Sequence, residues 1–307
     1  MANDFKYRAD HIGRLVPPPN VEGEDGAEIL RRILAMQKAC GVSVATDGEI
    51  VRGDLPAALL RQGLEGTPPR LFDEEAAPAL ALNMTAVALK VSLPAPSAAL
   101  VRLEAAAAAK GQPFDLEVAG PAVAKALRAE VDALLAGGTP YVQLNGAAYS
   151  ALLSEDVDAA RFEALLTLDR AVLEAVAVPE GGRLALRVGD LQHGTGVEGR
   201  LATVLALPAQ RFLFSFEGPA PDFGLLALAR EDADLVLGLV DNEGREQQDP
   251  DELMAVIDRA ALVVDADRLA LSPRGGFVPT AGANWDLQRR KLEQTADVAV
   301  RYWGFAM

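Results

Sequence analysis

Residues 87–110 read VALKVSLPAPSAALVRLEAAAAAK and contain one complete repeat of the pattern on which the fold depends. Residues 87–93 form a short apolar run with β-branched side chains, which predicts a buried strand. After two prolines, residues 97–110 have the composition and period of a helix. A buried strand followed at once by a helix is the unit from which parallel sheets are built.

The same unit recurs along the whole chain. Strands are predicted at residues 8–12, 42–45, 87–93, 141–144, 184–188, 212–216, 235–240 and 268–271. Helices are predicted to fill most of the gaps between them, for example at residues 27–39, 97–110, 118–135, 159–176, 250–263 and 287–302. Eight alternations predict an α/β fold of the (β/α)8 TIM-barrel type, formed by residues 1–307 as a single domain. Prolines and glycines interrupt residues 54–85, which are expected to be an irregular insertion near the barrel mouth.

Bulk composition excludes several classes of function. The 44 acidic and 29 basic residues leave a net charge of −15, which would repel nucleic acid and anionic membranes. One cysteine, Cys40, leaves no pair for a disulfide or a redox motif. No apolar run is long enough to span a membrane, and the first ten residues are polar. We therefore expect a cytoplasmic protein whose partner is a small molecule, or a second copy of the chain.

In α/β barrels the functional residues emerge at the carboxyl ends of the strands. Here these positions include Asp47 and Glu49 after the second predicted strand, and Asn145 after the fourth. The two histidines, His11 and His193, have no partner at metal-ligand spacing. Residues 194–196 and 274–276 are rich in glycine but match no phosphate-binding motif. The strand ends alone thus predict a mouth and no particular reaction.

Several strand ends resemble those of the cobalamin-independent methionine synthase family, in its short single-barrel branch. Residues 10–15, DHIGRL, resemble the family's DHVGSL, and residues 44–49, VATDGE, resemble its VTDGE. Residues 141–146, YVQLNG, are similar to YIQLDE, and residues 272–277, SPRGGF, to SPxCGF. The pieces occur in the family's order and cover nearly the whole chain. The resemblance implies a methionine-synthase-like barrel related to uroporphyrinogen decarboxylase.

The resemblance also implies a zinc site, from which this sequence departs. Family members bind zinc through a His-x-Cys pair, a glutamate and a second cysteine, and the metal holds a thiol that accepts a methyl group from a folate. The matching positions are Arg187, Gly189, Glu217 and Gly275. In an alternative register, His193 would replace Arg187 as the counterpart of the histidine. Because no thiolate remains in either register, we expect no metal site and predict no cofactor, while folate binding stays open.

The replacements at these positions indicate an anionic ligand. Arg187 brings a permanent positive charge near the position of the metal, and we expect it to pair with Glu217. The family's homocysteine subsite is matched by Gly13, Arg14, Glu49 and Asn145, where an arginine replaces a serine and an amide replaces an aspartate. The predicted catalytic residues are Glu217 and Arg187. The predicted substrate-binding residues are His11, Gly13, Arg14, Asp47, Glu49, Asn145, His193 and Arg274.

Three functions remain open. The first is a zinc-independent enzyme that acts on a small anionic substrate, with Glu217 as acid or base and the arginines as electrostatic clamps. The second is transfer of a methyl or alkyl group from a folate-type donor to a thiol, as the resemblance implies. The third is a catalytically inactive binding or partner subunit, in which Arg14 and Arg187 only form structural ion pairs with Glu49 and Glu217.

Overall fold

The computed structural model describes residues 7–50, 53–82, 87–191, 197–217, 221–278 and 284–304. Its strands are β1 (Val44–Ala45), β2 (Ala88–Pro94), β3 (Tyr141–Asn145), β4 (Arg183–Asp190), β5 (Arg211–Ser215), β6 (Asp234–Val240) and β7 (Leu269–Pro273). Its longer helices are α1 (Gly26–Ala39), α2 (Leu55–Glu65), α4 (Pro96–Ala109), α5 (Leu116–Ala136), α7 (Ala159–Ala175), α9 (Pro250–Ala261) and α10 (Trp285–Trp303). Shorter helical elements are α3 (Ala77–Leu82), α6 (Tyr149–Leu152), α8 (Val197–Leu205), η2 (Phe72–Ala76), η3 (Gly224–Leu228) and η4 (Ala266–Arg268).

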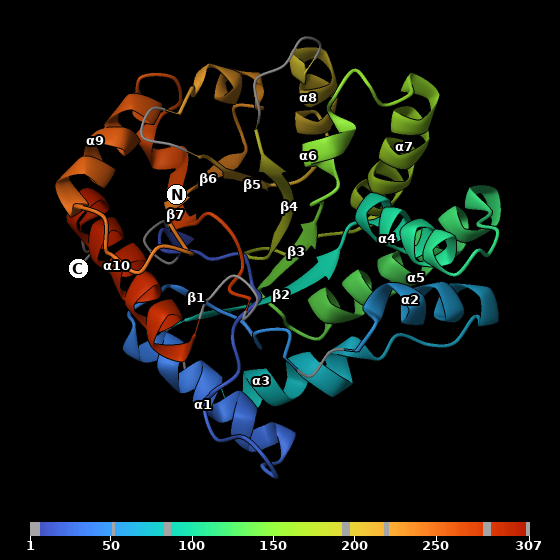
Figure 1. Cartoon of the computed structure of the whole chain (residues 1–307), viewed down its shortest axis with the longest axis horizontal. Coiled ribbons are helices and arrows are strands. Elements are labelled where there is room, and N and C mark those ends of the chain that lie inside the picture. Colours follow the sequence, from blue (N-terminus) through green and yellow to red (C-terminus); the bar gives the residue numbers. More distant parts are fainter. Residues whose placement is uncertain are drawn as a thin grey trace.

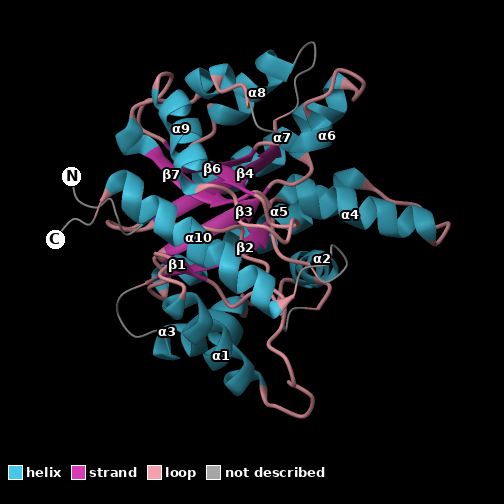
Figure 2. Cartoon of the chain, turned by 60° about the vertical axis from the view of Figure 1, so that its left-hand side comes forward, coloured by secondary structure: helices cyan, strands magenta, loops and turns pink. Residues whose placement is uncertain are grey.

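The seven strands pair in sequence order, and every pair is parallel. Helices surround the sheet on its outer side (Figures 1 and 2). The predicted alternation of strands and helices is therefore confirmed. None of the helices in the described part of the chain is long and apolar enough to cross a membrane.

The predicted first strand, residues 8–12, is reduced to a single bridge. Ala9 pairs with Leu271 of β7 in parallel, and the backbone N–H of Ser43, just before β1, donates to the carbonyl of Ala9. The side chain of Ser43 also bonds to Ala9, at 3.0 Å to its N–H and 3.1 Å to its carbonyl. Ala9 thus links the two outer strands of the sheet, although the described residues form seven strands where eight were predicted.

Acidic and amide side chains start most of the long helices. Asp25, Asp115, Asp158, Asp249 and Asn284 each accept a hydrogen bond from a backbone N–H in the first turn of the helix that follows. A side-chain acceptor at this position satisfies an N–H that has no partner within the helix.

Residues 54–82 are more regular than the predicted irregular insertion. Asp54 caps α2, Pro56 lies in its first turn, and Gly66 ends it in a left-handed conformation with φ 71°. Proline in the first turn and glycine after the last turn are compatible with a helix. Residues that were expected to break the structure therefore mark the ends of a helix. Residues 83–85 lie outside the described residues.

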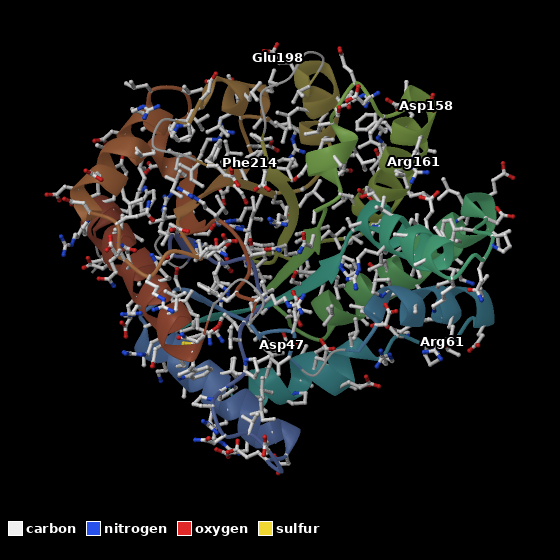
Figure 3. The ribbon with its side chains drawn as sticks, viewed as in Figure 1. Asp47, Arg61, Asp158, Arg161, Glu198 and Phe214 are labelled. Carbon is white, nitrogen blue, oxygen red and sulfur yellow. The ribbon has the colours of Figure 1, made fainter. Side chains whose placement is uncertain are left out.

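Packing separates the apolar interior from a charged outer surface. The labelled side chains Arg61, Asp158, Arg161 and Glu198 lie on the outer helices (Figure 3). Phe214 of β5 is completely buried and belongs to the core between the strands and the helices. A smaller cluster gathers apolar residues from all seven strands and from residues 7–12: Tyr7, Ile12, Val44, Ala88, Tyr141, Ala185, Leu213, Val236 and Ala270.

Candidate functional site

A cavity of about 210 Å³ opens beside the carboxyl ends of β2 and β3. Its walls include Arg14, Glu49, Ser92, Pro94, Arg102 and Asn145, together with the first residues of α2. We call this cavity the mouth pocket. Three of the predicted substrate-binding residues, Arg14, Glu49 and Asn145, therefore line one cavity although they are far apart in the sequence.

Gly13 lies against the same wall. Its φ of +128° is a conformation that other residues rarely adopt, and a Cβ built on it would lie 3.1 Å from Cβ of Ser92 and 3.2 Å from Oε1 of Glu49. A side chain at position 13 would push against both residues. Glycine is thus required here for the close approach of the chain to Ser92 and Glu49.

Arg187 extends from β4 toward these residues. Its guanidinium donates to Oδ1 of Asn145 at 3.2 Å and to Oγ of Ser215 at 3.5 Å. Burial lowers the pKa of Arg187, although the carboxylates of Asp190 and Glu49 act in the opposite direction. Its buried Nε has no hydrogen-bond partner, and within the described residues the side chain forms no ion pair. Within the described residues, the hydrogen-bond partners of this partly buried cation are therefore neutral.

The expected ion pair between Arg187 and Glu217 does not form between these two described residues. Glu217 is exposed, two residues beyond the end of β5. The guanidinium points instead to the amide of Asn145 on the neighbouring strand β3. A carboxylate in water is well solvated and gains little from a partner, which is why Glu217 can remain at the surface.

Other predicted residues lie away from the mouth pocket. His11 is buried, its Nε2 lies 2.8 Å from Oε1 of Gln37, and burial together with the charge of Lys90 lowers its pKa to about 4. Asp47 is buried beside a different cavity, of about 310 Å³, that also adjoins α1 and η2. Its Oδ1 accepts from the N–H of Glu49 at 3.2 Å, which helps to shape the turn that carries Glu49. Asp47 thus does not line the mouth pocket but helps to position Glu49, which does.

Arg274 and His193 complete the predicted set. Arg274 follows β7 and lines a third cavity, of about 550 Å³, next to β6 and α9. Its buried Nε has no hydrogen-bond partner. His193 lies outside the described residues, so the alternative register that uses it stays a prediction.

Three of the four positions that match zinc ligands in the resemblance carry no zinc-binding side chain. Arg187, Gly189 and Gly275 offer no side-chain donor of the kind zinc binds. Gly189 has φ 89° at an irregularity in the pairing of β4 with β5, and a Cβ there would lie 2.7 Å from Oγ of Ser150. Among the described residues, no three His, Cys, Asp or Glu side chains are grouped closely enough to hold a metal ion.

Below the mouth pocket, the strands enclose a polar network that the sequence analysis did not identify. Nζ of Lys90 lies 2.6 Å from Oδ1 of Asp10, and both side chains are completely buried. Lys90 also donates to Gln143 at 2.9 Å, and the hydroxyl of Tyr141 donates to Asp10 at 2.9 Å. Burial by itself would raise the pKa of Asp10, but the charges of Lys90 and Arg211 lower it. A lysine within an apolar strand was the available signal, since such a residue needs a buried partner.

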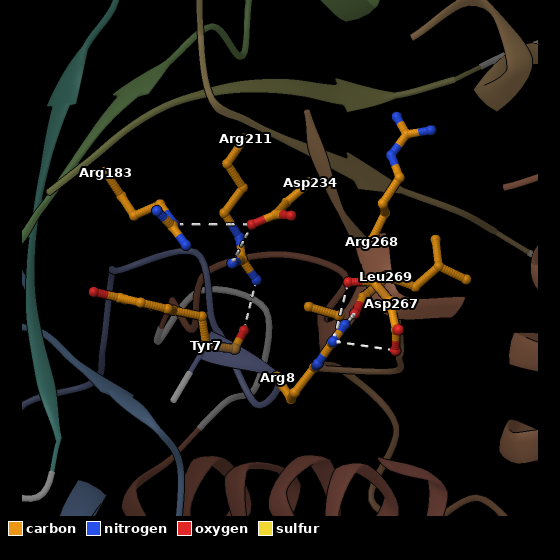
Figure 4. A pocket seen from close by; sticks show the side chains of 9 residues that line it. Tyr7, Arg8, Arg183, Arg211, Asp234, Asp267, Arg268 and Leu269 are labelled. Atoms are coloured by element: carbon orange, nitrogen blue, oxygen red, sulfur yellow. Dashed lines mark hydrogen bonds and ion pairs between the residues drawn. The ribbon is translucent and has the colours of Figure 1, made fainter. Parts of the chain in front are cut away.

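The opposite end of the sheet also carries arginines, but their charges have partners (Figure 4). Arg211 donates to the carbonyl of Tyr7 at 2.6 Å and lies 3.6 Å from Asp234. Arg8 donates to the carbonyls of Leu269 and Asp267. The cavity between these residues measures about 20 Å³, which is room for one water molecule. At this end the arginines therefore connect distant segments of the chain, and the cavity between them is too small for a substrate.

Comparison with known proteins agrees with this arrangement. No family model matches the chain. A candidate vitamin-B12-independent methionine synthase from Listeria monocytogenes superposes with a TM-score of 0.76 at 21% identity, over 97% of this chain and 98% of that one. The chain has a methionine-synthase-like fold.

Two further structures and two curated proteins are also similar to this chain. The B12-independent methionine synthase of Shewanella sp. W3-18-1, in complex with selenomethionine, has a TM-score of 0.72 at 15% identity and covers 98% of this chain and 99% of its own. A methyltransferase from Methanosarcina mazei has a TM-score of 0.62 at 14% identity over 98% of this chain and 100% of its own. The uncharacterized Bacillus subtilis proteins YxjH and YxjG are 25% and 26% identical over 97% of this chain and 95% of their own.

Proposed function

We propose that the chain is an enzyme that binds a small anionic substrate in the mouth pocket and works without zinc. The observation that carries this proposal concerns the guanidinium of Arg187, which is partly buried. Within the described residues, no carboxylate forms an ion pair with it. Burying a charge without a counter-charge is costly. An anionic ligand would supply the missing charge, and it would gain a charge-assisted contact with two-pronged geometry.

The proposed roles follow from position. Arg187 acts as the electrostatic clamp and Asn145 orients it, since its amide oxygen accepts from the guanidinium. Glu49 lies in the pocket wall, and Glu217 lies beyond the end of β5. We propose Glu217 as the general acid or base. Glu49 is a second carboxylate whose role in the reaction should be tested together with that of Glu217. We also propose that residues 8–12 complete a closed (β/α)8 barrel through Ala9.

The alternative function is methyl or alkyl transfer to a thiol. The methyltransferase of Methanosarcina mazei and the methionine synthase of Shewanella favour it, because both share the fold. A thiol acceptor would have to be activated without the family's cysteine ligands, because Gly189 and Gly275 occupy those positions.

Ligand binding to Arg187 variants tests the proposal. The full chain and the variants Arg187→Met and Arg187→Lys are titrated with butyrate, glutarate and inorganic phosphate by calorimetry. We expect saturable binding of a carboxylate, weakened about tenfold or more by Arg187→Met and less by Arg187→Lys, which keeps the charge. Undisturbed binding to Arg187→Met, or no binding of any anion to the parent chain, would refute it.

Metal analysis separates the two functions. Zinc at one equivalent per chain, together with turnover of a thiol and a methyl folate, would establish the alternative.

A further inference from the structure

We infer that the ligand of the mouth pocket is a small dicarboxylate, and that Arg102 of α4 selects it by binding the second carboxylate. This inference rests on the proposed function, because it takes Arg187 and Asn145 as the site of the first carboxylate. The inference adds Arg102 to the proposed binding site. Unlike the other proposed residues, Arg102 lies on a helix and not at the end of a strand.

Arg102 reaches the pocket because of its helical position. Ala98 and Arg102 are four residues apart on α4, so they share one face of the helix, and both line the mouth pocket. Arg14 approaches the same cavity from the segment after Ala9, and its carbonyl accepts from the N–H of Phe277 at 2.9 Å. Arg102 and Arg14 therefore belong to different elements but face one space.

The start of α4 is firmly held, which makes Arg102 a well-placed contact. Asp169 of α7 accepts from the N–H of Ser97 at 2.7 Å and from its hydroxyl at 2.6 Å. Further along, Glu104 pairs with Arg161 of α7. A binding residue on a helix fixed at two points loses little freedom when a ligand binds.

The charges around the pocket favour a ligand with more than one negative group. Within the described residues, the side chains of Arg14 and Arg102 form neither ion pairs nor hydrogen bonds, and the guanidinium of Arg187 donates only to neutral groups. Among the residues that line the cavity, Arg14 and Arg102 carry guanidinium groups and Glu49 carries the carboxylate, while the guanidinium of Arg187 contacts the cavity wall at Asn145. A monocarboxylate would neutralise the charge of Arg187 and leave Arg14 and Arg102 without a counter-charge. A dicarboxylate would bind Arg187 with one carboxylate and Arg102 with the other.

The volume of this open cavity suits a small ligand. At roughly 30 Å³ for each water molecule, about 210 Å³ holds the volume of roughly seven waters. Dicarboxylates of four or five carbons are of this size. The cavity is smaller than the usual range for drug-sized ligands, ~300–1,000 Å³.

The test compares matched acids with one and two carboxylates. Succinate, glutarate, butyrate and valerate are titrated into the full chain, into Arg102→Gln and into the control Arg128→Gln. Arg128 is an exposed arginine on α5 that pairs with Asp132 on its own helix. We expect succinate or glutarate to bind about tenfold more tightly than the monocarboxylate of equal length. Arg102→Gln should weaken the binding of succinate and glutarate about tenfold and so remove this preference, and Arg128→Gln should change nothing.

Two outcomes would overturn the inference. Equal binding of both classes of acid to the parent chain would refute the dicarboxylate while leaving the proposed function intact. A preference that survives Arg102→Gln would remove Arg102 from the site. Failure of every acid to bind would instead contradict the proposed function itself. Melting curves of Arg102→Gln that match the parent chain show that the variant is folded, since the side chain is exposed.

Discussion

Replacing Asp169 by asparagine should change how stability depends on pH. Asp169 is completely buried in α7 and accepts three hydrogen bonds, from the N–H and hydroxyl of Ser97 and from the hydroxyl of Tyr149. Burial raises its pKa from 3.8 to about 6, and the hydrogen bonds from Ser97 and Tyr149 oppose this rise. Hydrogen bonds to a carboxylate can lower its pKa below the usual value, so the direction of the shift shows which effect is stronger.

The sign and size follow from proton linkage. A carboxyl group whose pKa is raised in the folded state binds more protons there than in the unfolded state. Its contribution to stability is complete below pH 3.8 and is lost as the pH rises through about 6. The difference between the two values corresponds to about 3 kcal/mol, at ~1.4 kcal/mol for each pKa unit. Asparagine resembles the protonated acid and cannot ionise, so Asp169→Asn should not lose this stability.

Urea unfolding of the parent chain and of Asp169→Asn, from pH 4 to pH 8, measures the effect. The difference in free energy of unfolding between them should grow in favour of the variant up to about pH 6 and then stay constant. Asp132→Asn on the surface of α5 is the control, and it should follow the parent chain. A difference that is independent of pH, or one that favours the parent chain as the pH rises, would refute the reasoning about burial.

Three further perturbations test the interior beneath the mouth pocket. Lys90→Met removes the partner 2.6 Å from Asp10 and should lower the free energy of unfolding by roughly 3–5 kcal/mol in urea titrations, with partial recovery when Asp10→Asn is added. Gly189→Ala places a Cβ 2.7 Å from Oγ of Ser150 at φ 89°, and should cost about 1–3 kcal/mol; unchanged stability would contradict this. Neutral His11 contributes stability that is present above pH 6.5 and is lost as the pH falls through about 4. Its ring resonances should titrate near pH 4 by NMR, and a midpoint near 6.5 would count against its burial.

Periodicity predicted the order of the elements well and the first strands poorly. The predicted strand 87–93 became β2, shifted by one residue at both ends, and the predicted strand 141–144 became β3, longer by one residue at its carboxyl end. Residues 8–12 and 42–45 were predicted as full strands, yet they form one bridge at Ala9 and the two-residue β1. The side chain of Ser43 bonds to the backbone of Ala9 at this point. The N–H of Ala9 thus donates to a side chain where a regular strand would use a backbone carbonyl. The pattern of apolar residues in the sequence does not indicate such a replacement.

The sequence predicted only those residues of the candidate site that lie at the carboxyl ends of strands. Arg14, Glu49 and Asn145 were found by this rule, and they line the mouth pocket. Arg102 was missed because it lies on α4, although its spacing of four residues from Ala98 places both on the face that meets the strand end. His11 was assigned to the site from its position at the carboxyl end of the predicted strand 8–12, but it is buried and its Nε2 lies 2.8 Å from Oε1 of Gln37 on α1.

Arginines occur at both ends of the sheet, and their partners tell the two ends apart. Arg8 and Arg211 are buried at one end, where backbone carbonyls and Asp234 accept from them or lie close by. Desolvation of these charges is thus compensated within the protein. At the other end, Arg187 is largely withdrawn from water and meets only neutral groups. Because compensation within the described residues is incomplete there, a negative ligand would bind more strongly at this end than at the other, in spite of the net charge of −15.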